Sequence, residues 1–123
     1  MAMPASAERL DHILDAIAQI ETATAGMSKG AFEANRFVRL GVERCIEIIS
    51  EAVRHLPDDW KSRHTQISWR QVADIGNRIR HAYHAVDSEI IWAIVEVDLV
   101  DLKMAIEAMK QPNDRALGRQ GEQ

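Results

Sequence analysis

The side chains best suited to chemistry gather within eight residues, beyond the middle of the chain. They comprise one amide, two guanidinium groups, two imidazoles and a phenol, carried by Asn77, Arg78, Arg80, His81, Tyr83 and His84. If the chain is helical from Trp69 to about His84, Asn77, Arg80, His81 and His84 stand at relative positions 0, 3, 4 and 7 and converge on one face. Arg70 lies on the same side, and Tyr83 borders it.

This set of groups suits the cleavage of a phosphodiester bond in RNA. That reaction needs a base for the 2′-hydroxyl proton, an acid for the leaving oxygen and positive charge near the phosphate. Histidine transfers protons near neutral pH, and arginine binds phosphate oxygens with its planar fork. The chemistry requires no metal. An ordinary solvated helix face is the alternative interpretation, since clustered Arg and His are common on exposed helices.

A metal site is a further possibility for the same segment. His81 and His84 could share a cation if Asp74 or Asp87 completed the set of ligands, but two histidines three residues apart form a weak pattern. We therefore expect no metal and no cofactor.

Apolar residues recur at three- and four-residue spacing over most of the chain and predict an all-α protein. The expected helices run from Ser6 to near Gly26, from Ser28 to Pro57, from Trp69 to about His84, and from Asp87 or Ser88 to Pro112. The stretch from Pro57 to His64 lacks this periodicity and contains turn formers, which predicts a surface loop of about ten residues. Main helices joined by mostly short loops predict an up-and-down four-helix bundle.

The apolar stripes of these helices give the expected core. The second helix contributes Phe37, Val38, Val42, Cys45, Ile48, Ile49, Ala52, Val53 and Leu56. The third contributes Val72, Ile75, Ile79 and Ala82. Cys45, the single cysteine, therefore reads as a buried structural thiol and not as a nucleophile.

Length and composition indicate one helical domain over residues 1–111, followed by a polar, disordered tail over 112–123. No apolar run reaches the roughly 18 residues of a membrane span, and the first residues lack the features of a secretory signal. We expect a cytoplasmic protein without a membrane partner. The net charge is −4, yet residues 60–86 hold five cations and one acid, so a local basic site on an acidic body is possible.

The segment from Ser68 to Asp87, continued by Glu89-Ile90-Ile91-Trp92, resembles the HepT-like proteins of the HEPN superfamily. The upstream stretch from Val42 to Ala52 is similar to the second helix of that family. The resemblance covers most of residues 8–110.

The resemblance implies a metal-independent ribonuclease that acts as the toxin of a prokaryotic toxin-antitoxin pair, usually as a homodimer whose two motifs line one cleft. The implied antitoxin is a minimal nucleotidyltransferase that attaches AMP to the motif tyrosine. Carried over by position, His81 is the catalytic histidine, Tyr83 the AMP acceptor and Asn77 the polar residue after the motif arginine.

The family motif RxxxxHxY places arginine five residues before the histidine, and in this sequence that position is Gly76. Arg80, with Arg78, is then the expected source of charge for the phosphate. His84 and Arg70 are expected to support the site. The alternative is a non-catalytic subunit that presents a nucleotide or substrate to a nucleotidyltransferase, and a third possibility is an interaction bundle without chemistry.

Overall fold

The computed structural model describes residues 5–81 and 87–111. Within those residues every regular element is a helix, which confirms the all-α prediction. The elements are α1 (Ser6–Thr24), α2 (Lys29–Ala34), α3 (Arg36–Arg54), α4 (Asp58–Lys61), α5 (Trp69–Arg80), α6 (Ser88–Ala93), the π-helical turn η1 (Ile94–Asp98) and α7 (Leu99–Met109). In this part of the chain, no helix combines the length and apolar character that crossing a bilayer requires.

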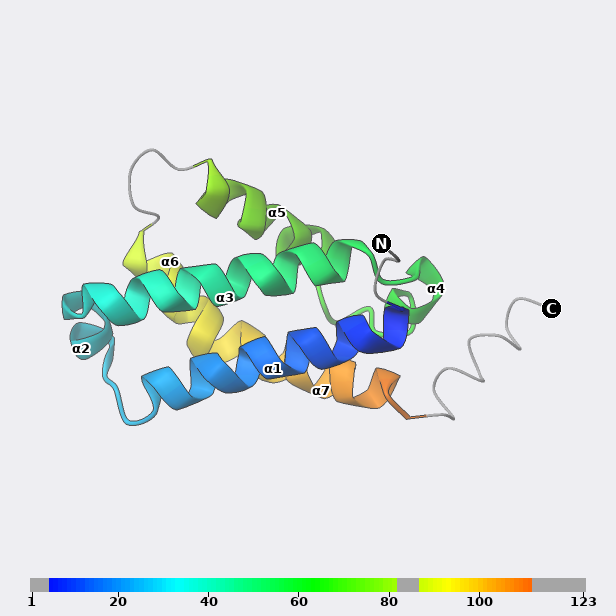
Figure 1. Ribbon diagram of the computed structural model, residues 1–123, viewed down its shortest axis with the longest axis horizontal. Helices are drawn as coiled ribbons and strands as arrows, with labels where there is room; N and C mark the ends of the chain where they lie inside the picture. The colour runs from blue at the N-terminus through cyan, green and yellow to red at the C-terminus, as the bar shows by residue number, and fades with distance from the viewer. Residues whose placement is uncertain (1–4, 82–86, 112–123) are drawn as a thin grey trace.

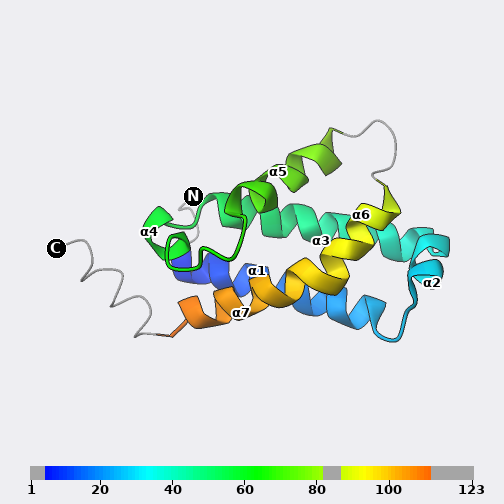
Figure 2. The same cartoon turned by 180° about the vertical axis from the view of Figure 1, so that it is seen from behind.

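Helices α1, α3, α5 and the arm formed by α6, η1 and α7 run alternately in opposite directions (Figure 1). Helix α3 is central, because it packs against α1 on one side and α5 on the other, while α7 packs on α1. Figure 2 shows the same order from behind, with α5 lying apart from α7. The core lies mainly between α1, α3 and α7, and its fully buried side chains include Leu10, Ile13, Ile17, Ile20, Val42, Ile49, Val53, Ile106 and Met109.

The second predicted helix is divided into α2 and α3 at Asn35. This residue adopts an extended conformation, and its side-chain oxygen accepts a hydrogen bond from the Val38 amide at 3.0 Å. Asparagine competes with helical backbone hydrogen bonds in this way, so it starts a new helix where periodicity alone predicts continuity. Ser28 caps α2 as expected, accepting from the Ala31 amide at 3.1 Å. The predicted surface loop contains the short helix α4.

The prediction that Phe37 and Ile48 belong to the core is wrong. The Phe37 side chain is 89% exposed and that of Ile48 is 37% exposed, while Ile46 takes a buried place on α3. Periodicity finds a wide apolar stripe but does not reveal which of its edges meets a neighbouring helix. The aromatic contact at this end of the molecule is made instead by Phe32 of α2 and Trp92 of α6, with ring centroids 5.1 Å apart.

Polar contacts fix the start of α5 and the start of the helix that follows it. At its start, the indole N–H of Trp69 donates to the carbonyls of Lys61 at 2.9 Å and His64 at 3.1 Å. Beyond its far end, Asp87 caps α6 by accepting from the Glu89 amide at 2.9 Å, as its position predicted. These contacts hold α5 against the preceding loop and define where the next helix begins.

A close contact between Ser50 of α3 and Gly76 of α5 joins the two helices. The Ser50 side chain is 2% exposed, and its hydroxyl donates to the Ala73 carbonyl at 2.7 Å. The same oxygen accepts a hydrogen bond from the Gly76 amide at 3.2 Å. A Cβ atom at position 76 would lie 2.4 Å from the Ser50 oxygen, so only glycine permits this approach without a shift.

Gly76→Ala is therefore expected to destabilise the protein by about 1–3 kcal/mol, although alanine favours a helix more than glycine does. Gly41→Ala on α3 is the matched control, because nothing lies within 4 Å of a Cβ atom there. The control should stabilise the protein by up to about 1 kcal/mol. Urea unfolding measures both free energies, and equal effects of the two substitutions would refute the packing role of Gly76.

Candidate functional site

The candidate site lies at the C-terminal end of α5. The helix ends at Arg80, and His81 follows as its capping residue. The His81 amide donates to the Asn77 carbonyl at 3.0 Å, so His81 stays one turn beyond Asn77, as a continued helix would place it. His81 is exposed and Asn77 is half-buried. Tyr83 and His84 lie outside the described residues, as does the predicted continuation of the helix to His84.

The two arginines of the motif lie on different sides of α5. Two residues correspond to a rotation of about 200° around a helix, so Arg78 and Arg80 flank Asn77 and His81 instead of sharing one face. Both are exposed, and neither forms an ion pair or hydrogen bond with any other described residue. Their guanidinium groups are therefore available to an anion approaching this end of the helix.

Arg80 lies on the side of α5 that faces the outer surface of α3, near Glu51. The hydrogen bond between His55 and Glu51, 3.0 Å long, is the main reason that the pKa of Glu51 is lowered. The positive charge of Arg80 adds to the same effect. The hydrogen-bond partner of Glu51 is thus His55 on its own helix, and Arg80 forms no ion pair in the described structure.

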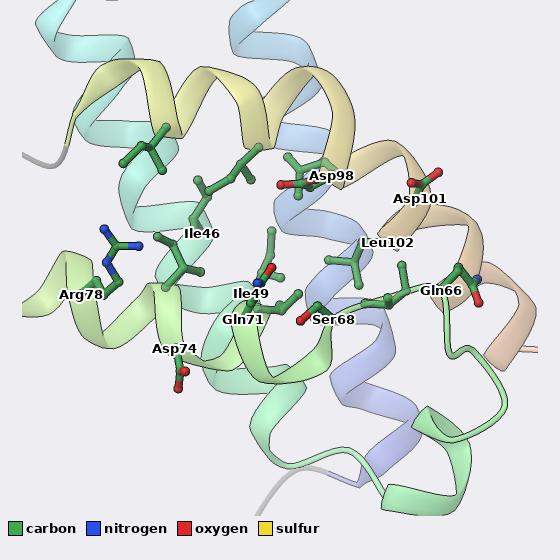
Figure 3. Close-up of a pocket in the computed structure, with 16 residues that line it drawn as sticks. Ile46, Ile49, Gln66, Ser68, Gln71, Asp74, Arg78, Asp98, Asp101 and Leu102 are labelled. Atoms are coloured by element: carbon green, nitrogen blue, oxygen red, sulfur yellow. The ribbon is translucent and has the colours of Figure 1, made fainter.

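Arg78 lies on the other side, beside a groove of about 470 Å³ between α5 and the arm of α6, η1 and α7 (Figure 3). Aliphatic side chains line its inner part, among them Ile46, Ile49, Ile75, Ile94 and Leu102. Polar groups border it on both walls: Gln71, Asp74 and Arg78 on α5, with Asp98 and Asp101 opposite. Such a groove can accept a flat apolar group with polar edges.

Arg70 is exposed in the first turn of α5 and is not brought to the site. Eleven residues of helix separate it from His81, a distance of about 16 Å along the axis. The lysines do not supply free charge either, because each is held by a carboxylate. The pairs are Lys29 with Glu89 at 2.9 Å, Lys61 with Asp58 at 3.6 Å, Lys103 with Glu21 at 3.2 Å and Lys110 with Asp11 at 2.6 Å.

Position 76, where the family motif carries arginine, is buried against α3. A side chain here would point at Ser50 and not toward His81. The positive charge at this end of α5 therefore comes from Arg78 and Arg80. An isolated glycine within a helical pattern is a sequence signal for close backbone approach, and it could have indicated this packing role.

Sequence reasoning also missed the groove and its acidic wall. Asp98 and Asp101 stand on the arm far from the motif in sequence, and no motif links them to Arg78. In the sequence, both acids stand next to the apolar stripe of the last predicted helix, and this position could have indicated that they border a groove. Among the residues that the structure describes, no three His, Cys, Asp or Glu side chains are grouped as metal ligands would be.

The sequence matches the protein-family model described as ribonuclease HepT-like over residues 13–109. The "Probable ribonuclease HepT" of Thermococcus cleftensis is 33% identical over 102 residues, which cover 83% of this chain and 93% of that protein. A Methanocaldococcus jannaschii protein named as a gamma-glutamylcyclotransferase and, provisionally, an RNase is 31% identical over 106 residues; these are 86% of this chain and 48% of that relative. A Caldanaerobacter subterraneus protein provisionally named an RNase is 26% identical over 102 residues, which cover 83% of this chain and 91% of that protein. No solved structure matches the chain significantly.

Cys45 of α3 is half-buried, so the prediction of a buried thiol is met only in part, and its reactivity can be tested. Burial raises the pKa of its thiol, the nearby Asp15 raises it further, and Arg44 opposes them. We expect Cys45 to react with iodoacetamide more slowly at pH 7 than free cysteine does, and to accelerate only at a more alkaline pH than free cysteine requires. Mass spectrometry follows the alkylation. Alkylation at the rate of free cysteine would show that the thiol is not protected.

Proposed function

The chain belongs to the ribonuclease HepT-like family, and we propose that it is a metal-independent ribonuclease whose reactive end is the last turn of α5. One observation carries this proposal most strongly. An exposed histidine closes the helix between two exposed arginines that have no partner within the described residues. The names of the relatives, which refer to ribonucleases, support the same substrate class.

In the proposed reaction, the 2′-oxygen of a ribose attacks the adjacent phosphorus and the bond from phosphorus to the 5′-oxygen breaks. His81 takes the 2′-hydroxyl proton or gives a proton to the leaving 5′-oxygen. Arg80 and Arg78 approach the phosphate from the two sides of α5 and stabilise its increased negative charge. Asn77, one turn before His81, orients the phosphate or the ribose through its amide.

The reaction needs both a base and an acid, whereas the described part of this end holds one imidazole. A homodimer in which two copies of the motif line one cleft would supply the second group. The family resemblance implies such a dimer, and we propose it here. Exposed apolar side chains that could contribute to a contact follow one face of η1 and α7, namely Val97, Val100 and Met104.

Replacing His81 by alanine is expected to lower the rate of RNA cleavage at least about 100-fold, because proton transfer to or from the reacting oxygens is lost. Arg80→Ala and Arg78→Ala should each lower it by about 10- to 100-fold. His12→Ala is the matched control, since His12 is exposed on α1 and should be dispensable. Single-turnover cleavage of a labelled oligonucleotide in the presence of EDTA measures all four. Equal cleavage by wild type and His81→Ala would exclude His81 from the mechanism.

We further propose that the chain is the toxin of a toxin-antitoxin pair in the cytoplasm, neutralised by a minimal nucleotidyltransferase that transfers AMP to Tyr83. The motif His81-Ala82-Tyr83 supports this role through its match to the family pattern. An adenylyl group two residues beyond His81 would add bulk and negative charge beside Arg78 and Arg80, where it would compete with RNA for the same positive field.

With the nucleotidyltransferase and ATP, the intact mass of the chain should therefore rise by one or more adenylyl groups, and cleavage should fall in parallel. Tyr83→Phe should keep cleavage but lose the first modification. Modification of Tyr83→Phe to the same extent as wild type would place the acceptor elsewhere. Intact-mass spectrometry and the cleavage assay measure the two effects on one sample.

A second candidate function is a non-catalytic subunit that presents a nucleotide or substrate to a nucleotidyltransferase. The observation that favours it is Gly76, because the motif arginine is missing and the position cannot accept one beside Ser50. Gly76→Arg is for this reason a poor test of restored activity. This second function would be supported if RNA stays intact after prolonged incubation with concentrated wild-type protein while the protein still binds the nucleotidyltransferase. Cleavage of the RNA would support the ribonuclease instead.

A further inference from the structure

Phe37 is the most exposed of the large apolar side chains in the described structure, at 89%. It stands in the first turn of α3, directly after the exposed Arg36, and Leu40 follows one turn later at 53% exposed. The neighbouring Phe32 is fully buried and packs on Trp92, so the local core is complete without the Phe37 ring. The face of this ring is therefore free to contact a ligand.

A small cavity adjoins the same turn of α3. It has a volume of about 250 Å³ and is lined by Phe32, Arg36, Arg39, Leu40, Glu43, Ser88 and Ile91. The Nε atom of Arg39 is buried and has no hydrogen-bond partner among the described residues. A buried donor without an acceptor is unfavourable, so a ligand oxygen that accepts this hydrogen bond would be stabilised here.

We propose that the surface formed by Arg36, Phe37 and Leu40 binds single-stranded RNA. An unpaired base stacks on the Phe37 ring, and Arg36, which also borders the cavity, holds the adjoining phosphate. Arg39 lies about 200° around α3 from Phe37, in the cavity, and offers its Nε–H to a further ligand oxygen there. This combination of an exposed aromatic ring with guanidinium groups is what a strand with unstacked bases requires. The proposal rests on the proposed ribonuclease function, since the bound strand is the substrate, and it adds a binding site separate from the cleavage site.

The position of this surface suits a strand that also reaches His81. Helix α5 runs antiparallel to α3 and meets it at Ser50 and Gly76, so the end of α5 lies toward the N-terminal half of α3 (Figure 1). At 1.5 Å per residue, His81 and Phe37 are separated by about 12 Å along the axis of α3. That is roughly three to four stacked nucleotides at 3.4 Å each.

Two carboxylates near this surface are engaged in ion pairs. Glu89 pairs with Lys29 at 2.9 Å, and Glu47 pairs with Arg44 at 3.1 Å. Glu43 borders the cavity; burial raises the pKa of its carboxyl, and the positive charge of the neighbouring Arg39 opposes that shift. Arg36 forms no ion pair or hydrogen bond with the other described residues and keeps its full charge for the ligand.

The test measures binding of a 2′-O-methyl oligonucleotide of about twelve nucleotides, which has no 2′-hydroxyl to attack the phosphate. Fluorescence anisotropy gives the affinity. Phe37→Ala and Phe37→Leu should each weaken binding by roughly 5- to 100-fold, whereas Phe37→Trp should bind about as well as wild type, because only an aromatic face supports stacking. Arg36→Ala should also reduce the dependence of log affinity on log salt by about 0.7, and Arg63→Ala in the loop after α4 should not.

Cleavage assays separate this proposal from the proposed function. The Phe37 variants should cleave a dinucleotide as fast as wild type and lose efficiency only on longer strands, while His81→Ala loses both activities. Wild-type affinity of Phe37→Leu would overturn the stacking proposal, and so would conversion of a dimer to a monomer by Phe37→Ala in light scattering, which would identify a contact with a second copy. If His81→Ala cleaves normally while Phe37→Ala binds weakly, the proposed RNA-binding surface is supported and the catalytic role of His81 is excluded.

Discussion

The contact between Ser50 and Gly76 is the constraint on which the placement of the candidate site depends. One buried hydroxyl donates to the Ala73 carbonyl and accepts from the Gly76 amide, so it joins α3 to two positions of α5 that are about one helical turn apart. Because this contact turns Gly76 toward α3, the helix presents Asn77, Arg78 and Arg80 on its remaining sides and ends with His81 exposed. A rotation of α5 would remove this arrangement.

Helix α5 is supported on one side and open on the other. Ser50 and the apolar side chains of α3 hold its inner face, and Trp69 fixes its start to the preceding loop. Toward α7 there is a groove instead of a packed interface, and Arg78 lies on its wall. This openness leaves Arg78 without a partner in the described structure. Arg80, on the side toward α3, is also unpaired there, while carboxylates hold the lysines elsewhere. Two unpaired guanidinium groups therefore flank the end of α5.

Much of the fold follows from local signals in the sequence. The start of α5 at Trp69, the caps Ser28 and Asp87, and the buried positions Val42, Ile49, Ile106 and Met109 agree with periodicity and capping rules. The break at Asn35 was not predicted, because the sequence does not show whether the chain turns at this residue. Only where it turns can the asparagine side chain replace a helical hydrogen bond and start a new helix. Phe37 was misplaced because an apolar stripe wider than the buried face looks the same in sequence as one that is fully covered.

The candidate site was predictable in its residues but not in its arrangement. The motif indicated His81 and the arginines around it, and helical rotation alone places Arg78 and Arg80 on different sides of α5. Which of these sides faces the groove depends on which face of the helix meets α3. Gly76 shows this limit most clearly. In the sequence it reads as a missing arginine, but in the structure it is the residue that allows α5 to approach Ser50. Tertiary contacts between helices distant in sequence decide such roles.

The central claim is that the last turn of α5, as placed by α3, is the RNA-cleaving end of the molecule. The most direct measurement is the change in backbone amide chemical shifts on adding an uncleavable RNA oligonucleotide to the isotopically labelled protein. We expect the largest changes at Asn77 to His81, with further changes at the start of α3. Changes confined to α1 and α7, with residues 77–81 unaffected at saturation, would contradict it.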